Sequence, residues 1–158
     1  MKTRTMSGAF LCYGNEVLLM HRNPDRKVAP DMWAPVGGHI ESDEIDDPKT
    51  ACLREIEEET GIPAERITNL NLRYITTRKF EDEIRIVFIY TGKVSEKCDL
   101  PKSDEGVLYW VDFESLSELP MTFSMKQTVL HWSRHKNSTQ IFHGAVNATN
   151  DGITWSEL

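Results

Sequence analysis

Apolar positions open the chain as two short runs on either side of a turn. Ser7–Tyr13 and Glu16–Arg22 are rich in apolar side chains and flank the pair Gly14-Asn15. Glycine and asparagine adopt the positive φ of a tight turn more readily than other residues do. The pattern therefore predicts a β-hairpin at the start of the chain.

Two loops and a helix are predicted next. His21–Met32 mixes Asn, Pro, Asp, Arg and Lys without a period, and Trp33–Gly38, which holds a proline and ends in two glycines, leads into a second loop. Asp47 directly before a proline is a strong signal for the start of a helix, and Gly61, followed two residues later by a proline, is the matching stop. These signals predict a helix at about Pro48–Thr60.

The rest of the chain predicts strands and one further helix. Three segments alternate or run with β-branched and aromatic residues, and a later segment spaces its apolar residues with helical period. An Asn-Asp-Gly turn joins two final runs. The predicted strands are Asn71–Arg78, Ile84–Val94 and Gly106–Val111, the predicted helix is Ser124–His135, and the predicted closing hairpin pairs Gln140–Ala145 with Gly152–Trp155.

Strands and helices in this order predict an α+β fold, in which a β-sheet core carries helices on its faces. The chain has 158 residues, of which 39% are hydrophobic. This is enough for one sizeable core and too little for two, so we expect a single domain over residues 1–158. No internal repeat or low-complexity linker divides it.

The net charge of −7 comes from one segment of the chain. Nine acidic and two basic residues lie between Glu41 and Glu59, and the acidic and basic residues outside this segment balance each other. A protein that binds the nucleic-acid backbone shows a basic footprint instead. We therefore expect no nucleic-acid polymer among its partners.

Nothing in the sequence predicts export or a membrane partner. No run of about 18 apolar residues exists, and Met1–Thr5 carries two basic residues without a following apolar region of signal-peptide design. The three cysteines, Cys12, Cys52 and Cys98, are widely spaced and are expected to be free thiols. We expect a cytoplasmic protein.

Three glutamates of the acidic segment lie on one face of the predicted helix. At about 100° per residue, Glu55, Glu58 and Glu59 occupy a face about 100° wide, beside an apolar stripe that contains Cys52 and Ile56. Like charges at this spacing repel one another, so the face is either solvated or neutralised by a cation. Carboxylate oxygens suit Mg²⁺, which leaves positions free for water and for substrate phosphates.

The same segment resembles the signature of the Nudix hydrolase family. Gly38, five residues, Glu44 and nine residues precede Arg54–Ile62, which reads Arg-Glu-Ile-Glu-Glu-Glu-Thr-Gly-Ile. The family pattern is Gly, five residues, Glu, seven residues, then Arg-Glu-aliphatic-any-Glu-Glu-any-Gly-aliphatic. Every specified position is filled, and the second spacer is two residues longer, in the acidic stretch Ile45–Asp47, where a loop absorbs the extra residues at small cost.

The resemblance implies a Nudix fold, with a mixed β-sheet between helices (α/β/α), and Mg²⁺-dependent hydrolysis of a nucleoside-diphosphate-linked substrate. It implies metal ligands at Glu55, Glu58, Glu59 and a backbone carbonyl near Gly37, with Mn²⁺ as a substitute cation. Arg54 would hold a catalytic carboxylate in place. A glutamate within hydrogen-bond reach of the attacking water would take its proton, and Glu55 is the expected base.

A further acidic ligand or alternative base is expected at Glu105. Many Nudix proteins supply this group from a distant loop, and Glu105–Val111 resembles the segment that carries it. Asp104 is the weaker candidate, and both residues also fit an ordinary charged turn between strands. The role of Glu44 stays open between a functional carboxylate and a loop or helix-end partner.

The C-terminal segments suggest a substrate class. Ile141–Gly144 and Trp155–Leu158 are similar to the closing strands of MutT-like enzymes that hydrolyse oxidised purine nucleoside triphosphates, which implies a (d)NTP pyrophosphohydrolase that releases a nucleoside monophosphate and pyrophosphate. Two base-reading features of the mammalian relatives are absent. Ala34 stands where they place an asparagine after the tryptophan, and Met121–Met125 lacks their acidic pair, so a preference for 8-oxoguanine is one hypothesis among several.

Other functions remain as alternatives. ADP-ribose and dinucleoside polyphosphates are the alternative substrates, although Thr76–Lys79 replaces the proline or tyrosine common in those subfamilies. A non-catalytic nucleotide sensor with a Nudix fold is a further alternative. Nudix-fold proteins of that kind usually lose the glutamates or the arginine of the family signature, and this chain keeps all of them. A monomer and a homodimer are both compatible with the sequence.

Several side chains outside the Nudix signature have two interpretations each. Aromatic residues stack on a base or pack in the core, and lone cations contact phosphates or stay solvated. The aromatic candidates are Trp33, Phe80 and Phe123, the cationic candidates are Arg22, Arg78 and Lys79, and His39 is expected to be a loop residue more than a ligand.

Overall fold

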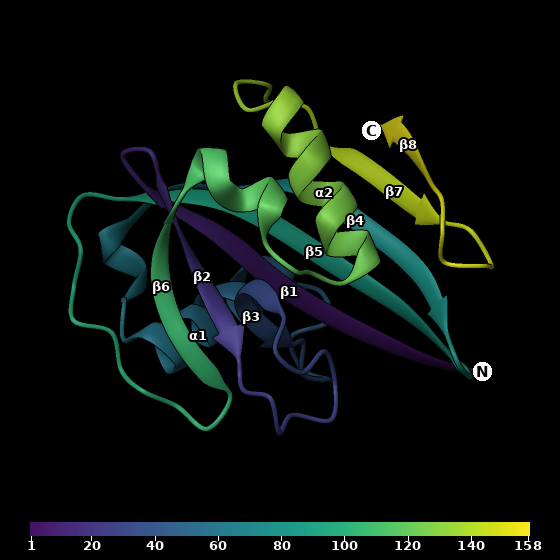
Figure 1. Cartoon of the computed structure of the whole chain (residues 1–158), viewed down its shortest axis with the longest axis horizontal. Helices are drawn as coiled ribbons and strands as arrows, with labels where there is room; N and C mark the ends of the chain where they lie inside the picture. Colours follow the sequence, from purple (N-terminus) through teal and green to yellow (C-terminus); the bar gives the residue numbers. More distant parts are fainter.

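The computed structural model describes the whole chain, Met1–Leu158, which is built around one eight-stranded sheet (Figure 1). The strands follow the order β6-β2-β3-β1-β5-β4-β7-β8 across the sheet. Their bounds are β1 Lys2–Tyr13, β2 Glu16–Arg22, β3 Trp33–His39, β4 Ile67–Phe80, β5 Glu83–Val94, β6 Gly106–Asp112, β7 Phe142–Val146 and β8 Ile153–Glu157. The helices are α1 Pro48–Thr60 and α2 Phe123–Arg134, with short 3-10 helices η1 Ala64–Arg66 and η2 Phe113–Glu118.

β3 lies inside the sheet, in the gap where the first hairpin opens. β1 and β2 pair only next to their turn, where Leu11–Tyr13 faces Glu16–Leu18. Further from the turn, β3 lies between them and pairs antiparallel with both. The sequence predicted that Trp33–Gly38 leads into a loop, which follows at residues 40–47, but it did not predict that Trp33–His39 is itself a strand. Pairing with two neighbouring strands overrides the local preference of Pro35 and the glycines for turns.

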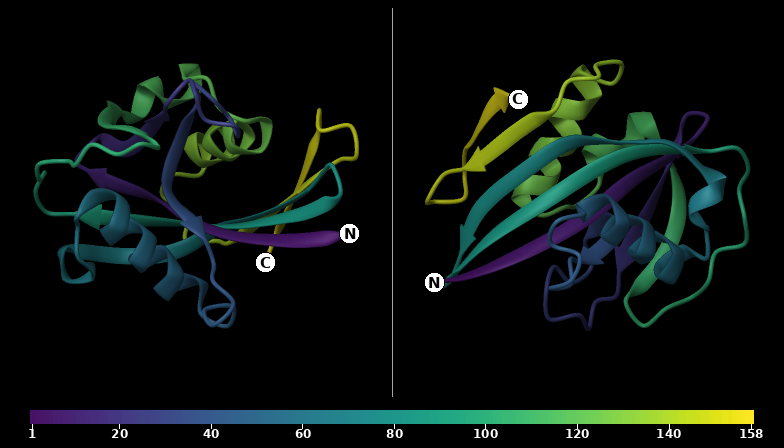
Figure 2. Two further views of the ribbon diagram at one scale, coloured as in Figure 1. Left: turned by 90° about the horizontal axis from the view of Figure 1, so that it is seen from below. Right: turned by 180° about the vertical axis from the view of Figure 1, so that it is seen from behind.

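The two helices cover opposite faces of a mixed sheet (Figure 2). β1 runs parallel to β5 and β4 runs parallel to β7, whereas the other neighbours are antiparallel. Cys52 and Ile56 of α1 are fully buried in the core on one face. Trp132 of α2 is buried on the other face, where its ring stacks on Phe10 at 4.8 Å between centroids. The predicted α+β fold, a mixed sheet between helices, is confirmed.

α1 has the predicted bounds because local interactions fix both of its ends. The Asp47 side chain caps the first turn and accepts a hydrogen bond from the Thr50 N–H at 3.1 Å. Gly61 ends the helix with a left-handed φ of +74°. The register of the glutamates along the helix therefore follows from local interactions at its two ends.

The other predicted strands and the second helix are present with longer or shifted ends. β1 starts at Lys2 and β4 spans Ile67–Phe80, so both are longer than their apolar patterns predict. The short helices η1 and η2 were not predicted. None of the helices is long and apolar enough to cross a membrane.

Candidate active site

The carboxylate face of α1 lies against the middle of β3. The backbone N–H of Gly37 donates a hydrogen bond to Oε2 of Glu59 at 2.9 Å. Gly37 has a φ of +152°, and a Cβ at this position would come within 2.2 Å of the carbonyl oxygen of Ser7 in β1. Glycine alone has the backbone freedom and the small size that this contact requires.

The carboxylate of Glu55 occupies the space beside Gly38. A Cβ on Gly38 would lie 2.5 Å from the carboxyl carbon of Glu55. Burial raises the pKa of Glu55, and the neighbouring Arg54 guanidinium opposes this rise. The absent side chain of Gly38 therefore makes room for a partly buried carboxylate on the α1 side of β3.

We expect Gly38→Ala to impair activity more than folding. The new methyl group collides with the end of a flexible side chain, so Glu55 moves while the strand stays in place. A displacement of about 1 Å in a catalytic group lowers kcat by about a hundredfold. Steady-state kinetics and thermal unfolding of the purified variant measure the two effects.

Gly152→Ala is the matched control for this substitution. Its new Cβ would meet the amide end of Asn147 at 2.8 Å, a clash of the same kind in the β7–β8 turn. Its kcat is expected to equal that of the wild type. Equal kcat values for Gly38→Ala and the wild type would contradict the assignment of Glu55 to the site.

Arg54 connects the helix to the loop that carries the two extra residues. Its Nε and Nη2 donate to the two carboxylate oxygens of Glu44 at 2.7 and 2.9 Å, which is a bidentate pair. Nη1 donates to Glu55 at 3.0 Å and to Glu58 at 3.2 Å. The hydrogen bonds from Arg54 lower the pKa of Glu44 to about 2. Despite the longer spacer, Glu44 is an ionic partner of Arg54, and Arg54 also donates a hydrogen bond to Glu55.

Glu105 joins the cluster from the loop before β6. Its carboxyl group lies in hydrogen-bonding contact with Glu59. Burial raises the pKa of Glu59 to about 8, the Gly37 N–H opposes this rise, and the negative charges of Glu105 and Glu55 add to it. Glu105 therefore lies near the helix glutamates Glu55 and Glu59. Asp104 is exposed, and its carbonyl oxygen accepts a hydrogen bond from the Asn23 side chain in a neighbouring loop.

Asn23 fixes the position of the Glu105 loop, and sequence reasoning did not single it out. Its backbone N–H donates to the Glu105 carbonyl at 3.0 Å, and its side-chain amide donates to the Asp104 carbonyl at 2.8 Å. Arg26 lies near the Glu105 carboxylate, with its Nη2 at 3.9 Å from Oε1. No local sequence signal connects residues so far apart in the chain.

Ser7 is a second residue that the sequence analysis missed. It pairs with Gly38 across β1 and β3, so its side chain points to the same face as Glu55. It is 2% exposed, and its Oγ has no hydrogen-bond partner. The signal in the sequence is a hydroxyl residue at the start of the apolar run that ends β1.

The cluster has the chemistry of a divalent-cation site. Beyond the effect of burial, the charge of Glu105 raises the pKa of Glu55 and of Glu59, and the charge of Glu55 raises the pKa of Glu59. In this conformation no three acidic, histidine or cysteine side chains form a ready-made metal site. Arg54 engages both Glu55 and Glu58, and the Glu58 side chain is 59% exposed and has room to turn. A set of oxygen donors with mutual repulsion fits a hard cation.

Most other candidate residues make contacts within the protein. The Trp33 ring stacks on His21 at 4.7 Å between centroids, and the Arg78 guanidinium lies 5.2 Å from the centre of the Phe80 ring. The His39 carbonyl oxygen accepts a hydrogen bond from Nη2 of Arg54 at 3.0 Å. Arg22 donates to the carbonyl of Val28, Phe123 begins α2, and Lys79 is exposed.

The class of this protein follows from its similarity to a known protein family. Residues 2–132 match the family model of the NUDIX domain, and the chain belongs to the Nudix family. It is a Nudix hydrolase, of the pyrophosphohydrolase type, that acts on nucleoside-diphosphate-linked substrates. Enzymes of this family generally use divalent metal ions. No protein of curated function matches the sequence.

Solved structures share this fold over most of the chain. The MutT protein from Bacillus halodurans has a TM-score of 0.71 at 22% identity and covers 98% of this chain and 97% of its own. A MutT NUDIX hydrolase from Burkholderia pseudomallei has a TM-score of 0.67 at 24% identity, with 83% and 98% covered. An Ap4A hydrolase from C. elegans has a TM-score of 0.64 at 19% identity, with 85% and 96% covered. At these identities the likeness concerns the fold.

Proposed function

We propose that the protein is a Mg²⁺-dependent (d)NTP pyrophosphohydrolase of the MutT type, which releases a nucleoside monophosphate and pyrophosphate. One observation carries this proposal. The carboxylates of Glu55 and Glu59 lie against the Gly37-Gly38 backbone, and Glu105, from a distant segment, lies close enough to both to add to the rise that burial causes in their pKa values. In the same proposal the enzyme works in the cytoplasm as a monomer or homodimer, without a nucleic-acid polymer or a membrane as partner.

The proposed roles follow from the position of each group. Glu55, Glu58, Glu59 and Glu105, with the Gly37 carbonyl, hold the metal, and Mn²⁺ substitutes for Mg²⁺. When bound, the ions supply neutralisation of the pyrophosphate charge and activation of a water molecule. Glu55 takes the proton of the attacking water, and Glu105 is the alternative base. Arg54 is a positioning residue that keeps the Glu55 carboxylate oriented by its hydrogen bond at 3.0 Å.

The substrate class is tested by initial rates across 8-oxo-dGTP, the four ordinary dNTPs, ADP-ribose and diadenosine tetraphosphate. The highest kcat/KM is expected for a nucleoside triphosphate. The alternatives remain in the panel because proteins with this fold include Ap4A hydrolases as well as MutT proteins. A kcat/KM at least about a hundredfold higher for ADP-ribose or the dinucleoside polyphosphate would replace the proposed substrate.

The raised pKa of Glu59 predicts that pH and Mg²⁺ act on stability in opposite directions. Its pKa is about 8 in the folded protein against an ordinary value of 4.5, so the folded state binds more protons within this window. The metal-free protein should therefore lose stability as pH rises from about 4.5 to about 8. Metal binds the deprotonated carboxylate, so apparent Mg²⁺ affinity should fall about tenfold per pH unit below this pKa.

Thermal unfolding at pH 6, 7 and 8, with EDTA or with a fixed Mg²⁺ concentration, measures both effects. The gain in Tm from Mg²⁺ should be largest at pH 8. The Glu59→Gln variant should lose most of this pH dependence. A gain in Tm that is the same at pH 6 and pH 8 would contradict the assignment of Glu59 as a ligand.

A further inference from the structure

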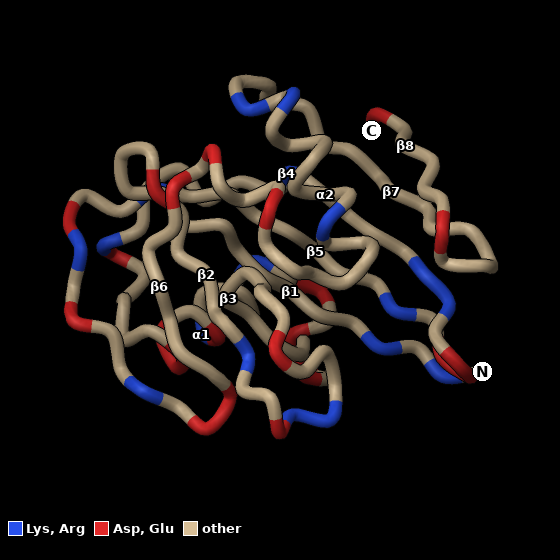
Figure 3. Tube along the Cα trace, in the orientation of Figure 1, with Lys and Arg blue, Asp and Glu red and all other residues tan.

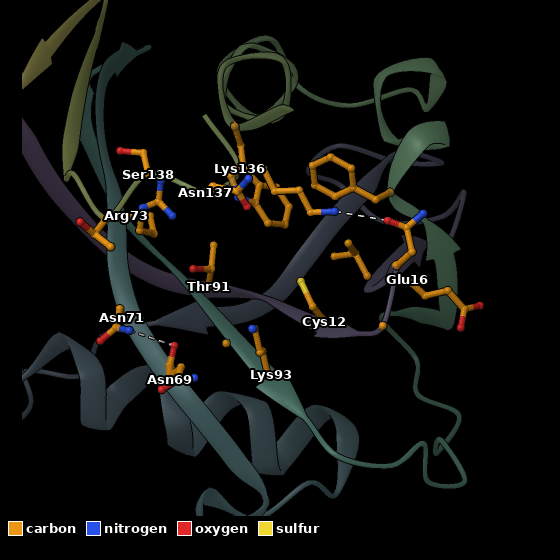
Figure 4. A pocket seen from close by; sticks show the side chains of 17 residues that line it. Cys12, Glu16, Asn69, Asn71, Arg73, Thr91, Lys93, Lys136, Asn137 and Ser138 are labelled. Atoms are coloured by element: carbon orange, nitrogen blue, oxygen red, sulfur yellow. Dashed lines mark hydrogen bonds between the residues drawn. The ribbon is translucent and has the colours of Figure 1, made fainter. Parts of the chain in front are cut away.

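A second concave site lies on the α2 side of the sheet. A cavity of about 470 Å³ opens between the β1–β2 turn, the strands β4 and β5, and the segment that follows α2 (Figure 4). We call it the Arg73 cavity, because Arg73 lies in its wall. It shares no residue with the carboxylate cluster, and Phe113 and Trp132 in its wall belong to the core under α2. An adjoining hollow of about 410 Å³, which reaches Ile141, shares Arg73 with it.

Arg73 is a buried cation without an acidic partner. It is 6% exposed and forms no salt bridge. Its Nε donates to the Gln140 carbonyl at 3.1 Å and its Nη2 donates to the His135 carbonyl at 3.2 Å, while its Nη1 makes no hydrogen bond. A buried charge that is not neutralised costs free energy, and an anion in the cavity would offset this cost.

Two lysines add to the positive charge of the Arg73 cavity. The Lys136 ammonium group lies 3.9 Å from the centre of the Phe113 ring and donates to Asn15 at 3.2 Å, so its position is fixed (Figure 4). Lys93 of β5 is exposed and forms no salt bridge. The one carboxylate in the wall, Glu16, is paired with Lys97 outside the cavity.

This charge contrasts with the rest of the molecule. The net charge of the chain is −7, and its surplus of acidic residues lies in the segment that contains α1 (Figure 3). Three cations line one cavity on the opposite side of the sheet, so this cavity is positively charged where the carboxylate cluster is negatively charged. In the metal-free protein an anion is repelled from the first site and attracted to the second.

The polar and aromatic residues of the lining indicate which kind of anion fits the cavity. Only four of the 17 lining residues are hydrophobic. The two aromatic ones, Phe113 and Trp132, are 7% and 2% exposed, so they offer no open face to a nucleobase. Neutral amides and hydroxyls cover much of the remaining wall, and such groups bind hydroxyls of a ligand. They are Asn15, Asn69, Asn71, Thr91, Asn137, Ser138 and Thr139.

We propose that the Arg73 cavity binds a small hydroxylated phosphate ester of the sugar-phosphate class. The phosphate group pairs with the buried Arg73, the positive charges of Lys93 and Lys136 in the same wall attract it, and the hydroxyl groups bond to the amide and hydroxyl side chains of β4, β5 and the segment after α2. This site is separate from the hydrolytic site. It does not depend on which nucleotide the enzyme cleaves.

Calorimetric titration of ribose 5-phosphate into the full chain in EDTA tests the proposal, because EDTA removes metal-dependent binding at the carboxylate cluster. Binding is expected for ribose 5-phosphate, with weaker binding for inorganic phosphate and none for ribose. Lys93→Glu and Lys136→Glu should each weaken binding by about tenfold or more. Both lysines are exposed, so these variants should fold. Amide NMR shifts are expected at Thr91 and Gly92 of β5.

Lys2→Glu is the matched control, since it makes the same charge change at the other end of β1 from the cavity. Its affinity should equal that of the wild type. Three results would overturn the proposal: no binding of ribose 5-phosphate at millimolar concentration, equal weakening by all three substitutions, or shifts at Gly37 and Gly38 in place of Thr91 and Gly92. Equal affinity for inorganic phosphate and ribose 5-phosphate would overturn the assignment of the hydroxylated ligand.

Discussion

Glu59→Gln should lower kcat by at least about a thousandfold while the protein stays folded and at least as stable without metal. Glutamine has nearly the same shape and still accepts the Gly37 N–H hydrogen bond, but it carries no negative charge for a cation. Burial raises the pKa of Glu59 to about 8, so the metal-free fold favours a neutral group at this position, and glutamine is neutral at every pH. Steady-state kinetics and Tm in EDTA measure these two results.

Glu57→Gln is the matched control on the same helix. Glu57 is exposed, and its side chain makes no hydrogen bond or salt bridge. Its kcat should stay at the wild-type value, and a Glu59→Gln variant with more than a tenth of wild-type activity would contradict the metal site. The experiment also separates the enzyme from a nucleotide sensor, because a sensor would bind nucleotides without turnover in the wild type and in both variants.

Gly37→Ala should lower the free energy of unfolding by about 3 kcal/mol. At a φ of +152° a side chain is strained, and the new Cβ would come within 2.2 Å of the Ser7 carbonyl oxygen and 2.5 Å of the Gly8 Cα. Both atoms belong to the backbone of β1, so relief of the clash requires two central strands to move apart. Urea unfolding followed by tryptophan fluorescence measures the loss.

Gly14→Ala separates the strain from the clash. Gly14 has a φ of +56°, and a Cβ there would meet nothing within 4 Å. The expected loss is about 1 kcal/mol, from the left-handed backbone alone. A loss for Gly37→Ala no larger than that for Gly14→Ala would show that β1 and β3 do not approach as closely as described.

The sequence predicted the fold class and the helix of the site because their signals are local. Asp47 and Gly61 define both ends of α1, which places Glu55, Glu58 and Glu59 on one face. The two extra residues in the Nudix signature change the geometry of the site little, because they fall in the loop before Asp47. Two successive turns in this loop let Glu44 reach Arg54.

The features that were missed depend on contacts between distant segments. β3 contains a proline and two glycines that favour a loop, and it becomes a strand because the open hairpin of β1 and β2 pairs with both of its edges. Asn23 acquires its role only when the loop after β2 meets the loop before β6. The Arg73 cavity combines residues from five separate segments, none of which carries a recognisable motif.

In the proposed function, the glutamate cluster hydrolyses a nucleotide anhydride with the help of a divalent cation. The most direct test follows the nucleotide panel by ³¹P NMR with the wild-type protein in Mg²⁺ and in EDTA. With Mg²⁺, we expect a nucleoside monophosphate and pyrophosphate from a nucleoside triphosphate, at a rate at least about a thousandfold higher than in EDTA and restored by excess Mg²⁺. Equal turnover in Mg²⁺ and in EDTA would contradict the proposed function.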